Sequence, residues 1–274
     1  MTFSIPPMFD MSGRTALITG STKGIGRAIA EQFVLHGASV TVTGRDLAEA
    51  EAAAEAINTQ AGREAAWGYA FDFTRLDEVN ALVDAAIARW GKLDTVVGNA
   101  YVTAIGNEAS VDPAVYAEVL RVNVVNNAAL AVRALPALKA GGDGAVVFIG
   151  SASGLAPSPG VAAYGVSKRA LLHMMQNLAL EWGQYGIRVN AVVPGLTRTE
   201  GAQAYTGDLS DPARLDQIAT WPLHRVGQPG EIAAACVFMC SPGGRFTTGA
   251  ILVSDGGRTL TANAAGGRHI RAPD

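Results

Sequence analysis

The sequence contains little charge and no large excess of either sign. Of its 274 residues, 16% are charged, and 21 Lys and Arg stand against 24 Asp and Glu, a formal net charge of −3. Intrinsic disorder requires high net charge with low hydrophobicity, and binding to phosphate backbones requires a basic surface. Because 49% of the residues are hydrophobic, we expect a folded protein that does not bind nucleic acid.

Cysteine and long apolar runs are also scarce. The two cysteines, Cys236 and Cys240, lie four residues apart in an apolar run, which indicates one buried helix face rather than a disulfide framework or a metal site. No stretch of about 18 consecutive apolar residues occurs. Met1–Met11 lacks the basic and apolar regions of a secretory signal. We therefore predict a cytoplasmic protein with no metal and no membrane contact.

Nothing in the sequence divides the chain into separate units. It has no linker rich in Pro, Gly or Ser and no internal repeat, so we predict a single domain over residues 1–274, with a core at about 13–260. Residues 195–228 form a long insertion of the kind that serves as a lid or binding loop. Within it, Tyr205 and Trp221 are candidates for the wall of a substrate pocket. Residues 261–274 are a tail of low apolar content.

Short β-branched or apolar runs alternate with longer helical patterns. Alternation of this kind predicts βαβ units and a parallel sheet, and near-continuous apolar runs indicate strands that are covered on both faces. We predict an α/β fold with one doubly wound parallel sheet of about seven strands and helices on both faces. The expected strands are Thr15–Thr19, Ser39–Thr43, Ala65–Phe71, Leu93–Val97, Ala145–Ile149, Ile187–Val193 and Ala250–Val253. The expected helices start near Gly24, Asp46, Arg75, Asp112, Ala162 and Pro229.

A glycine-rich loop follows the first expected strand and opens the first expected helix. Glycines there permit a tight turn and let the backbone and the helix N-terminus approach a pyrophosphate. Two more residues separate the first two glycines than in the usual dinucleotide fingerprint, and a purely structural loop is the alternative. The residues predicted to bind a dinucleotide are Gly20, Ser21, Thr22, Lys23, Gly24, Ile25 and Gly26.

The end of the second expected strand bears on the choice of cofactor. An acidic residue there would bind the ribose 2′-hydroxyl of NAD, whereas an Arg would accommodate the 2′-phosphate of NADP. Gly44 stands at the expected acidic position, Arg45 follows it, and Lys23 can supply a second positive charge. We predict NADP. NAD stays open if Arg45 is a solvated loop charge and Asp46 a helix cap.

Tyr164 and Lys168 lie four residues apart in a helical segment and therefore share one helix face. A phenol with a pKa of about 10 is a poor base at neutral pH. A cation held beside it favours the phenolate and prepares it for general acid and base catalysis. Ser151, thirteen residues before Tyr164 at the end of the fifth expected strand, can hydrogen-bond a substrate carbonyl and stabilise a developing alkoxide.

With these motifs the chain resembles the short-chain dehydrogenase/reductase family, from about Gly13 to Leu260. The resemblance implies a Rossmann-like fold, a homotetramer with the helices around 112–138 and 162–182 at one interface, and contacts of Tyr164 and Lys168 with the cofactor. It also implies that Asn123 is a fourth catalytic residue that holds a water for a proton relay. The further cofactor residues that it implies are Asp72, Asn99, Pro194, Gly195, Thr197 and Thr199.

The sequence departs from the family pattern after the fourth expected strand. Where the family usually has Asn-Asn-Ala-Gly, this chain has Gly98-Asn99-Ala100-Tyr101. Two interpretations of Tyr101 are open: a wall of the substrate pocket or a surface side chain.

Taken together, the motifs predict an NADP(H)-dependent oxidoreductase that transfers a hydride between the nicotinamide and a carbonyl or secondary alcohol, with Tyr164 as general acid and base. An NAD-dependent alcohol dehydrogenase of the same family is the first alternative. A dinucleotide-sensing regulatory protein without turnover is the second. The apolar residues of the insertion suggest a ketone, acyl thioester or steroid, while Arg198, Arg214 and Arg225 leave an anionic group open.

Overall fold

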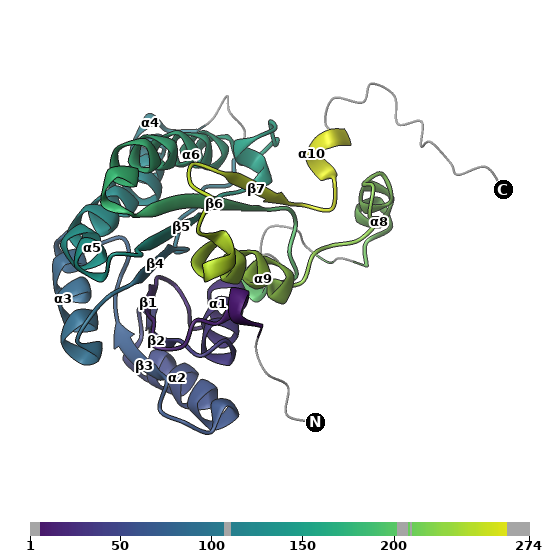
Figure 1. Ribbon diagram of the computed structural model, residues 1–274. Coiled ribbons are helices and arrows are strands. Elements are labelled where there is room, and N and C mark those ends of the chain that lie inside the picture. Colours follow the sequence, from purple (N-terminus) through teal and green to yellow (C-terminus); the bar gives the residue numbers. More distant parts are fainter. Residues whose placement is uncertain (1–5, 107–110, 202–207, 209, 262–274) are drawn as a thin grey trace.

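The computed structural model describes residues 6–106, 111–201, 208 and 210–261 (Figure 1). Seven parallel strands form one sheet in the order β3-β2-β1-β4-β5-β6-β7. The strands are β1 (Thr15–Ile18), β2 (Ser39–Gly44), β3 (Ala66–Ala70), β4 (Thr95–Gly98), β5 (Ala145–Ile149), β6 (Arg188–Pro194) and β7 (Ile251–Ser254). The prediction of seven parallel strands is confirmed, with shifts of one or two residues at their ends.

Helices cover both faces of the sheet, so the expected doubly wound architecture is confirmed (Figure 1). The helices are α1 (Gly24–Leu35), α2 (Leu47–Ala61), α3 (Val79–Trp90), α4 (Pro113–Leu120), α5 (Asn127–Gly141), α6 (Ala162–Trp182), α8 (Pro212–Ala219), α9 (Pro229–Cys240) and α10 (Arg258–Thr261). Buried side chains of α1, α2 and α9 form the core on one face, and those of α3, α5 and α6 form the core on the other.

The apolar strands supply side chains to both cores. In β1, Leu17 packs into the core of α3, α5 and α6, whereas its neighbours Ala16 and Ile18 pack into the core of α1, α2 and α9. Successive side chains of a strand point to opposite faces, so a strand covered on both sides is apolar throughout. This is why the runs 15–18 and 145–149 are buried along their whole length.

The strand order positions the functional site. From β1 the chain passes to β2 and β3 on one side and then crosses to β4 on the other side of β1. In open α/β sheets a crevice forms at the carboxyl ends of the strands where the order reverses in this way. The chain turns after β1 toward the face covered by α1 and after β4 toward the face covered by α5, and this divergence leaves room for a ligand at this edge of the sheet.

Three helical features bear on the sequence predictions. Asp46 and Asp112 cap α2 and α4, accepting hydrogen bonds from the backbone N–H of Glu49 and Ala114 at 2.9 and 2.8 Å. The expected helix around 112–138 contains a π-helical segment, Arg121–Asn126, between α4 and α5. In the described part of the chain, no helix combines the length and apolar character needed to span a membrane.

The cysteine prediction is confirmed, because both side chains are buried on α9. The insertion at 195–228 contains α8, and backbone hydrogen bonds join its two ends, between the N–H of Gly227 and the carbonyl of Leu196 and between the N–H of Arg198 and the carbonyl of Gly227. Tyr205 and, apart from Thr261, the tail at 261–274 lie outside the described residues.

Candidate active site

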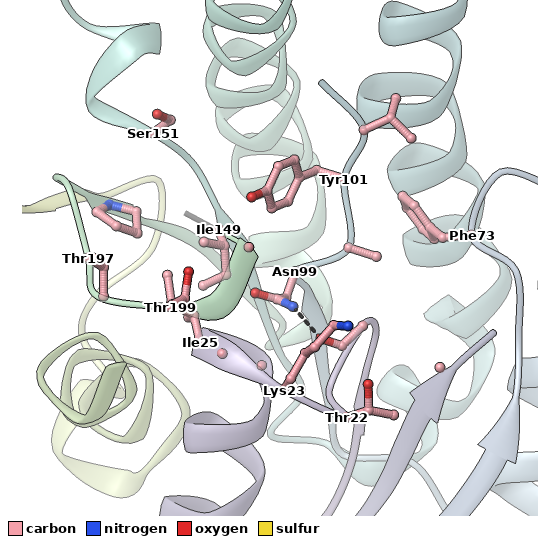
Figure 2. A pocket seen from close by; sticks show the side chains of 18 of the residues that line it. Thr22, Lys23, Ile25, Phe73, Asn99, Tyr101, Ile149, Ser151, Thr197 and Thr199 are labelled. Carbon is pink, nitrogen blue, oxygen red and sulfur yellow. Dashed lines mark hydrogen bonds between the residues drawn. The ribbon is translucent and has the colours of Figure 1, made fainter. Parts of the chain in front are cut away.

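A cleft of about 880 Å³ opens at the carboxyl edge of the sheet. It is lined by the loop after β1, the ends of β2 and β3, the loops after β4 and β5, α6 and the turn after β6 (Figure 2). Most of the site residues expected from the sequence meet there: Gly20, Thr22, Lys23, Gly24, Ile25, Gly26, Arg45, Asp72, Asn99, Tyr101, Ser151, Tyr164, Lys168, Pro194, Gly195, Thr197 and Thr199.

The glycine loop has a shape that only glycines allow. Gly20 and Gly24 have φ angles of 63° and 60°, in the left-handed region. A Cβ on Gly26 would lie 2.3 Å from the carbonyl oxygen of Gly20 and 2.6 Å from Nδ2 of Asn99. Asn99 donates from Nδ2 to the carbonyls of Thr19 and Gly20, both at 2.9 Å (Figure 2). The first turn of α1 is thus held against the loop, and its N-terminus faces the cleft as a pyrophosphate site requires.

Ser21 belongs to the loop but its side chain supports the loop from behind. It is fully buried; its Oγ donates to the carbonyl of Ile18 at 2.7 Å and accepts from the backbone N–H of Thr43 at 2.9 Å. The hydroxyl therefore joins β1 to β2 and does not line the cleft.

The end of β2 packs closely against the side chain of Thr22, which would have to move to admit an acidic side chain. A Cβ on Gly44 would lie 2.5 Å from Cγ2 of Thr22. Arg45 and Glu49 line the cleft beside it, while Asp46, as one of the sequence alternatives proposed, caps α2. Glu49 was not singled out from the sequence, because its place at this end depends on how α2 packs.

Asp72, after β3, has its carboxylate held in a turn. Its Oδ1 accepts from the backbone N–H and the hydroxyl of Thr74 at 2.9 and 2.8 Å. Burial acts to raise the pKa of Asp72, but the hydrogen bonds from Thr74 and the charges of Arg45 and Arg75 outweigh it, and the pKa lies below its usual value. The Asp72 carboxylate and the positive charge of Arg45 therefore belong to the same end of the cleft.

The turn after β6 lies against the glycine loop. A Cβ on Gly24 would touch Cβ and Cγ2 of Thr199 at 3.4 Å, so Thr199 lies beside the start of α1. Thr197 is buried and donates from Oγ1 to the carbonyl of Gly195 at 3.2 Å. Figure 2 shows both threonines on the same side of the cleft as Ile25.

The three residues expected to do chemistry meet at the other end of the cleft. Lys168 is 1% exposed, and its Nζ donates to the carbonyl of Ile149 at 2.7 Å and lies 5.6 Å from the centroid of the Tyr164 ring. Burial lowers the pKa of Lys168 to about 7. Ser151 follows β5, and its Oγ accepts from the backbone N–H of Ser153 at 3.2 Å. The structure thus brings a phenol, an amine and a hydroxyl together.

Asn123 lies behind the cleft rather than in its lining. It is fully buried in the π-helical segment; its Oδ1 accepts from the N–H of Val102 at 2.8 Å, and its Nδ2 donates to the carbonyl of Val102 at 2.8 Å and to Oγ of Ser167 at 2.9 Å. Its own carbonyl accepts from Nδ2 of Asn127 at 2.9 Å. Asn123 therefore joins the loop after β4 to α6, and its water-holding role stays a prediction.

Tyr101 lies at the cleft beside the catalytic candidates. Its ring is 43% exposed, and its centroid lies 5.5 Å from that of Tyr164 and 5.2 Å from Nζ of Lys168. Of the two interpretations left open by the sequence, the structure has Tyr101 in the wall of the cleft (Figure 2).

Trp221 does not line this cleft, contrary to expectation. Its side chain is 4% exposed and packs with Ile218 and Val226, and the Arg258 guanidinium lies 5.9 Å from its ring. The insertion uses its largest apolar side chain to build a small core of its own. Sequence reasoning also missed several apolar lining residues, which only their position at strand ends could have indicated: Phe71, Phe73, Val102, Ile149 and Leu196.

The chain is similar to known proteins over most of its length. A family model described as enoyl-(acyl carrier protein) reductase matches residues 20–259, which include every cleft residue described above. An uncharacterized oxidoreductase from Mycobacterium tuberculosis is 37% identical over 254 residues, covering 92% of this chain and 95% of the relative.

Two solved structures share the architecture. A 7α-hydroxysteroid dehydrogenase complexed with NADH and 7-oxo glycochenodeoxycholic acid aligns with a TM-score of 0.86 at 30% identity, over 93% of this chain and 98% of that one. A gluconate 5-dehydrogenase from Burkholderia cenocepacia in complex with NADP and tartrate aligns with a TM-score of 0.86 at 29% identity and the same coverage.

Proposed function

The chain belongs to the short-chain dehydrogenase/reductase family of oxidoreductases, and from that premise we propose that it is an NADP(H)-dependent enzyme that interconverts a carbonyl and a secondary alcohol. The observation that carries the proposal is one cleft with a glycine loop at one end and Ser151, Tyr164 and Lys168 at the other. A regulatory protein that only senses a dinucleotide would need the first end but not the second.

The residues of the cleft fit a dinucleotide. The first turn of α1 lines the cleft, Gly26 lets that turn pack against the carbonyl of Gly20, and Thr199 lies beside the start of the helix. On this proposal the loop at 20–26 and Thr199 bind the phosphates, and Asn99 holds the loop in shape. Asp72 contacts the adenine, and Thr197 with the turn Pro194–Gly195 contacts the nicotinamide side. The bound cofactor supplies or accepts the hydride.

The chain's own side chains handle the proton. Tyr164 donates a proton to the substrate oxygen in reduction and removes it in oxidation. The ammonium form of Lys168, 5.6 Å from the Tyr164 ring centroid, favours the phenolate and, as in the family, binds the ribose hydroxyls of the cofactor. Ser151 hydrogen-bonds the carbonyl oxygen where negative charge develops. As the family resemblance implies, Asn123 holds a water that relays protons between this group of residues and solvent.

The preference for NADP follows from charge and space at the end of β2. An aspartate at position 44 would meet Thr22, whereas Arg45 and Lys23 line the cleft with positive charge. A 2′-phosphate is an anion that arginine binds well, whereas an unphosphorylated ribose offers it only hydroxyls. The two similar structures carry NADH in one case and NADP in the other, so they do not distinguish the cofactors. The proposal of NADP therefore depends on the residues of this chain. An NAD-dependent alcohol dehydrogenase is the alternative.

The substrate that best matches the open end of the cleft is a carbonyl compound with an apolar or mixed body, such as a ketone, an acyl thioester or a steroid. Tyr101, Val102 and Leu196 line the cleft. We propose Tyr205 as a further residue of the substrate pocket. The similar structures carry a bile-acid derivative in one case and tartrate in the other, so the body of the substrate is a proposal drawn from these side chains.

We further propose a homotetramer. Val125 between α4 and α5, Val132 on α5 and Val166 on α6 are each about half exposed, at 49%, 56% and 49%. Contact between copies along α4, α5 and α6 would cover these side chains. A cytoplasmic location stays a prediction from the sequence.

Turnover with each cofactor tests the proposed function. Initial rates with NADPH and NADH would be measured against ketones, keto esters, 3-oxoacyl thioesters, steroids and ketoses. We expect NADPH-dependent turnover that Tyr164→Phe lowers by about 100-fold or more, because general acid catalysis contributes that much, while the Kd for NADPH changes less than about twofold. A fully active Phe variant contradicts the mechanism. Binding of NADPH without turnover anywhere in the panel contradicts the enzyme proposal and supports the sensing alternative.

A further inference from the structure

The amine of Lys168 lies beside two aromatic rings that also contact each other. Its Nζ is 5.6 Å from the ring centroid of Tyr164, one helical turn away on α6, and 5.2 Å from that of Tyr101, in the loop after β4. Both distances fall within the range of about 6 Å over which a ring attracts an ammonium group. Where the family usually has glycine, this chain therefore presents a second aromatic face to Lys168.

We propose that Tyr101 is a positioning residue for Lys168. The Tyr101 ring stabilises the ammonium form of the Lys168 side chain inside the cleft. The proposal deepens the proposed function and rests on it only for its catalytic consequence, that a charged Lys168 assists Tyr164. The interaction itself is a property of the protein without substrate.

The surroundings of Lys168 explain why a second ring matters. Nζ donates to the carbonyl of Ile149 at the end of β5, and the rings of Tyr164 on α6 and Tyr101 in the loop after β4 lie next to it. Ser151, after β5, lines the same cleft. Water is excluded, because Lys168 is 1% exposed. An ammonium group in such a place is stabilised by a ring quadrupole more strongly than one in water.

The charged side chains that line the same cleft lie toward the end that holds the glycine loop. They are Lys23 before α1, Arg45, Asp46 and Glu49 at the end of β2 and the start of α2, and Asp72 after β3. The lowered pKa of Lys168 has burial as its cause. At this end of the cleft, the carbonyl of Ile149 and the two aromatic rings therefore stabilise the ammonium form against the effect of burial.

Hydrogen bonds hold the backbone next to Tyr101 close to α6. Asn123 forms two hydrogen bonds with the backbone of Val102, the next residue, and a third with Ser167, which precedes Lys168. Ser167 in turn donates to the carbonyl of Tyr164 at 2.7 Å. One buried network thus connects the loop that carries Tyr101 to the turn of α6 that carries Tyr164 and Lys168.

Replacing the Tyr101 ring with another apolar side chain tests the effect of the ring on the pKa of Lys168. Tyr101→Leu keeps the cleft covered but has no π face, and Tyr101→Phe keeps the face but has no hydroxyl. We expect Leu to lower the pKa of Lys168 by about 0.5 to 1.5 units, as loss of a cation–π contact at a desolvated site implies, and Phe to leave it within about 0.2 units. Entry of water would instead raise the pKa, so the sign separates the two effects.

The experiment uses the sparse lysines of this chain. The sequence has four, Lys23, Lys92, Lys139 and Lys168, so protein labelled with ¹³C-lysine gives few ¹³Cε signals, and Lys168→Met identifies the one that matters. Titration of that signal by NMR, without cofactor or substrate, gives the pKa in wild type, Tyr101→Phe, Tyr101→Leu and Tyr101→Met. The Met variant repeats the loss of the ring if the Leu variant does not fold.

We expect the pKa of Lys168 to fall in Tyr101→Leu and Tyr101→Met and to stay unchanged in Tyr101→Phe. An unchanged or raised pKa in Leu and Met overturns the proposal, and so does an equal fall in Phe, which would assign the effect to the hydroxyl. Because the titration requires no turnover, it separates this inference from the proposed function. Failure of every substrate in the panel would leave the titration intact, and a working enzyme with an unresponsive Lys168 would contradict this inference alone.

Discussion

At the scale of single residues, Lys168 is the most costly feature of the candidate site. Placing an ammonium group where 1% of the side chain is exposed disfavours its charge, and burial lowers its pKa to about 7. Its carbonyl partner on β5 and the rings of Tyr101 and Tyr164 offset part of that cost. Functional sites commonly hold perturbed groups of this kind, because chemistry near neutral pH needs them.

This cost predicts how stability responds to pH. The pKa of Lys168 is about 7 in the folded state and near its ordinary 10.5 when unfolded, so between these values the unfolded state binds more protons and stability rises with pH. Below about pH 7 both states are protonated and the full penalty applies. Lys168→Met removes this dependence. The free energy of unfolding of the variant minus that of wild type should therefore be larger at pH 6 than at pH 9.

The expected difference between the two pH values is roughly 3 kcal/mol, since the dependence covers about two pH units, from the folded pKa of about 7 to pH 9, and each unit contributes about 1.4 kcal/mol. Urea unfolding of both proteins at both pH values measures it. Lys23→Met, at an exposed lysine before α1, is the matched control and should show no such difference. A Lys168→Met effect that is the same at pH 6 and pH 9 would contradict a buried, titrating amine.

At the scale of elements, the glycine loop and α1 act as one unit. Asn99, from the end of β4, bonds two carbonyls of the loop, and Gly26 lets the first turn of α1 approach the carbonyl of Gly20. Helix N-termini bind phosphates only when the backbone N–H groups are free to face them. The cradle therefore depends on a close packing that a single methyl group disturbs.

Gly26→Ala tests this packing directly. Its Cβ would lie 2.3 Å from the Gly20 carbonyl oxygen, so the loop backbone must move, and we expect the Kd for NADPH to rise about tenfold or more, a loss of about 1.4 kcal/mol. Gly183→Ala is the control, since Gly183 has a φ of −54° and nothing lies within 4 Å of the added Cβ. Fluorescence titration measures both. Equal affinities of Gly26→Ala and wild type would show that the loop does not hold the phosphates.

The sequence predicted elements well where their signals are local. The strands are apolar throughout because both faces are covered, and Asp46 and Asp112 mark helix starts because each caps its own helix. The π-helical segment at 121–126 was not predicted. Asn123 in that segment bonds Val102, which lies 21 residues earlier, and Ser167, 44 residues later. No periodicity within the segment reports such contacts.

At the scale of the whole molecule, the doubly wound sheet assembles the site from distant parts of the sequence. Its lining runs from Gly20 to Gly201 because the strand order reverses at β1 and β4. The family motifs therefore predicted most of the residues that meet in the cleft, although Ser21 and Asn123 lie behind it. They could not predict where aromatic side chains without a motif would pack: Tyr101 faces Lys168, whereas Trp221 is buried within the insertion.

A cleft built from so many segments should couple cofactor binding to global stability. A ligand that binds only the folded state at 100 times its Kd adds about 2.7 kcal/mol, and about 2–4 °C per kcal/mol implies a rise in Tm of about 5–10 °C. We expect this rise with NADPH and a smaller one with an equal concentration of NADH if, as we propose, Arg45 and Lys23 of the cleft bind the 2′-phosphate. Arg45→Ala should reduce the NADPH shift toward that of NADH and leave the NADH shift unchanged. Differential scanning fluorimetry measures all four shifts, and an Arg45→Ala protein that keeps the wild-type difference between the two cofactors would show that Arg45 does not recognise the phosphate.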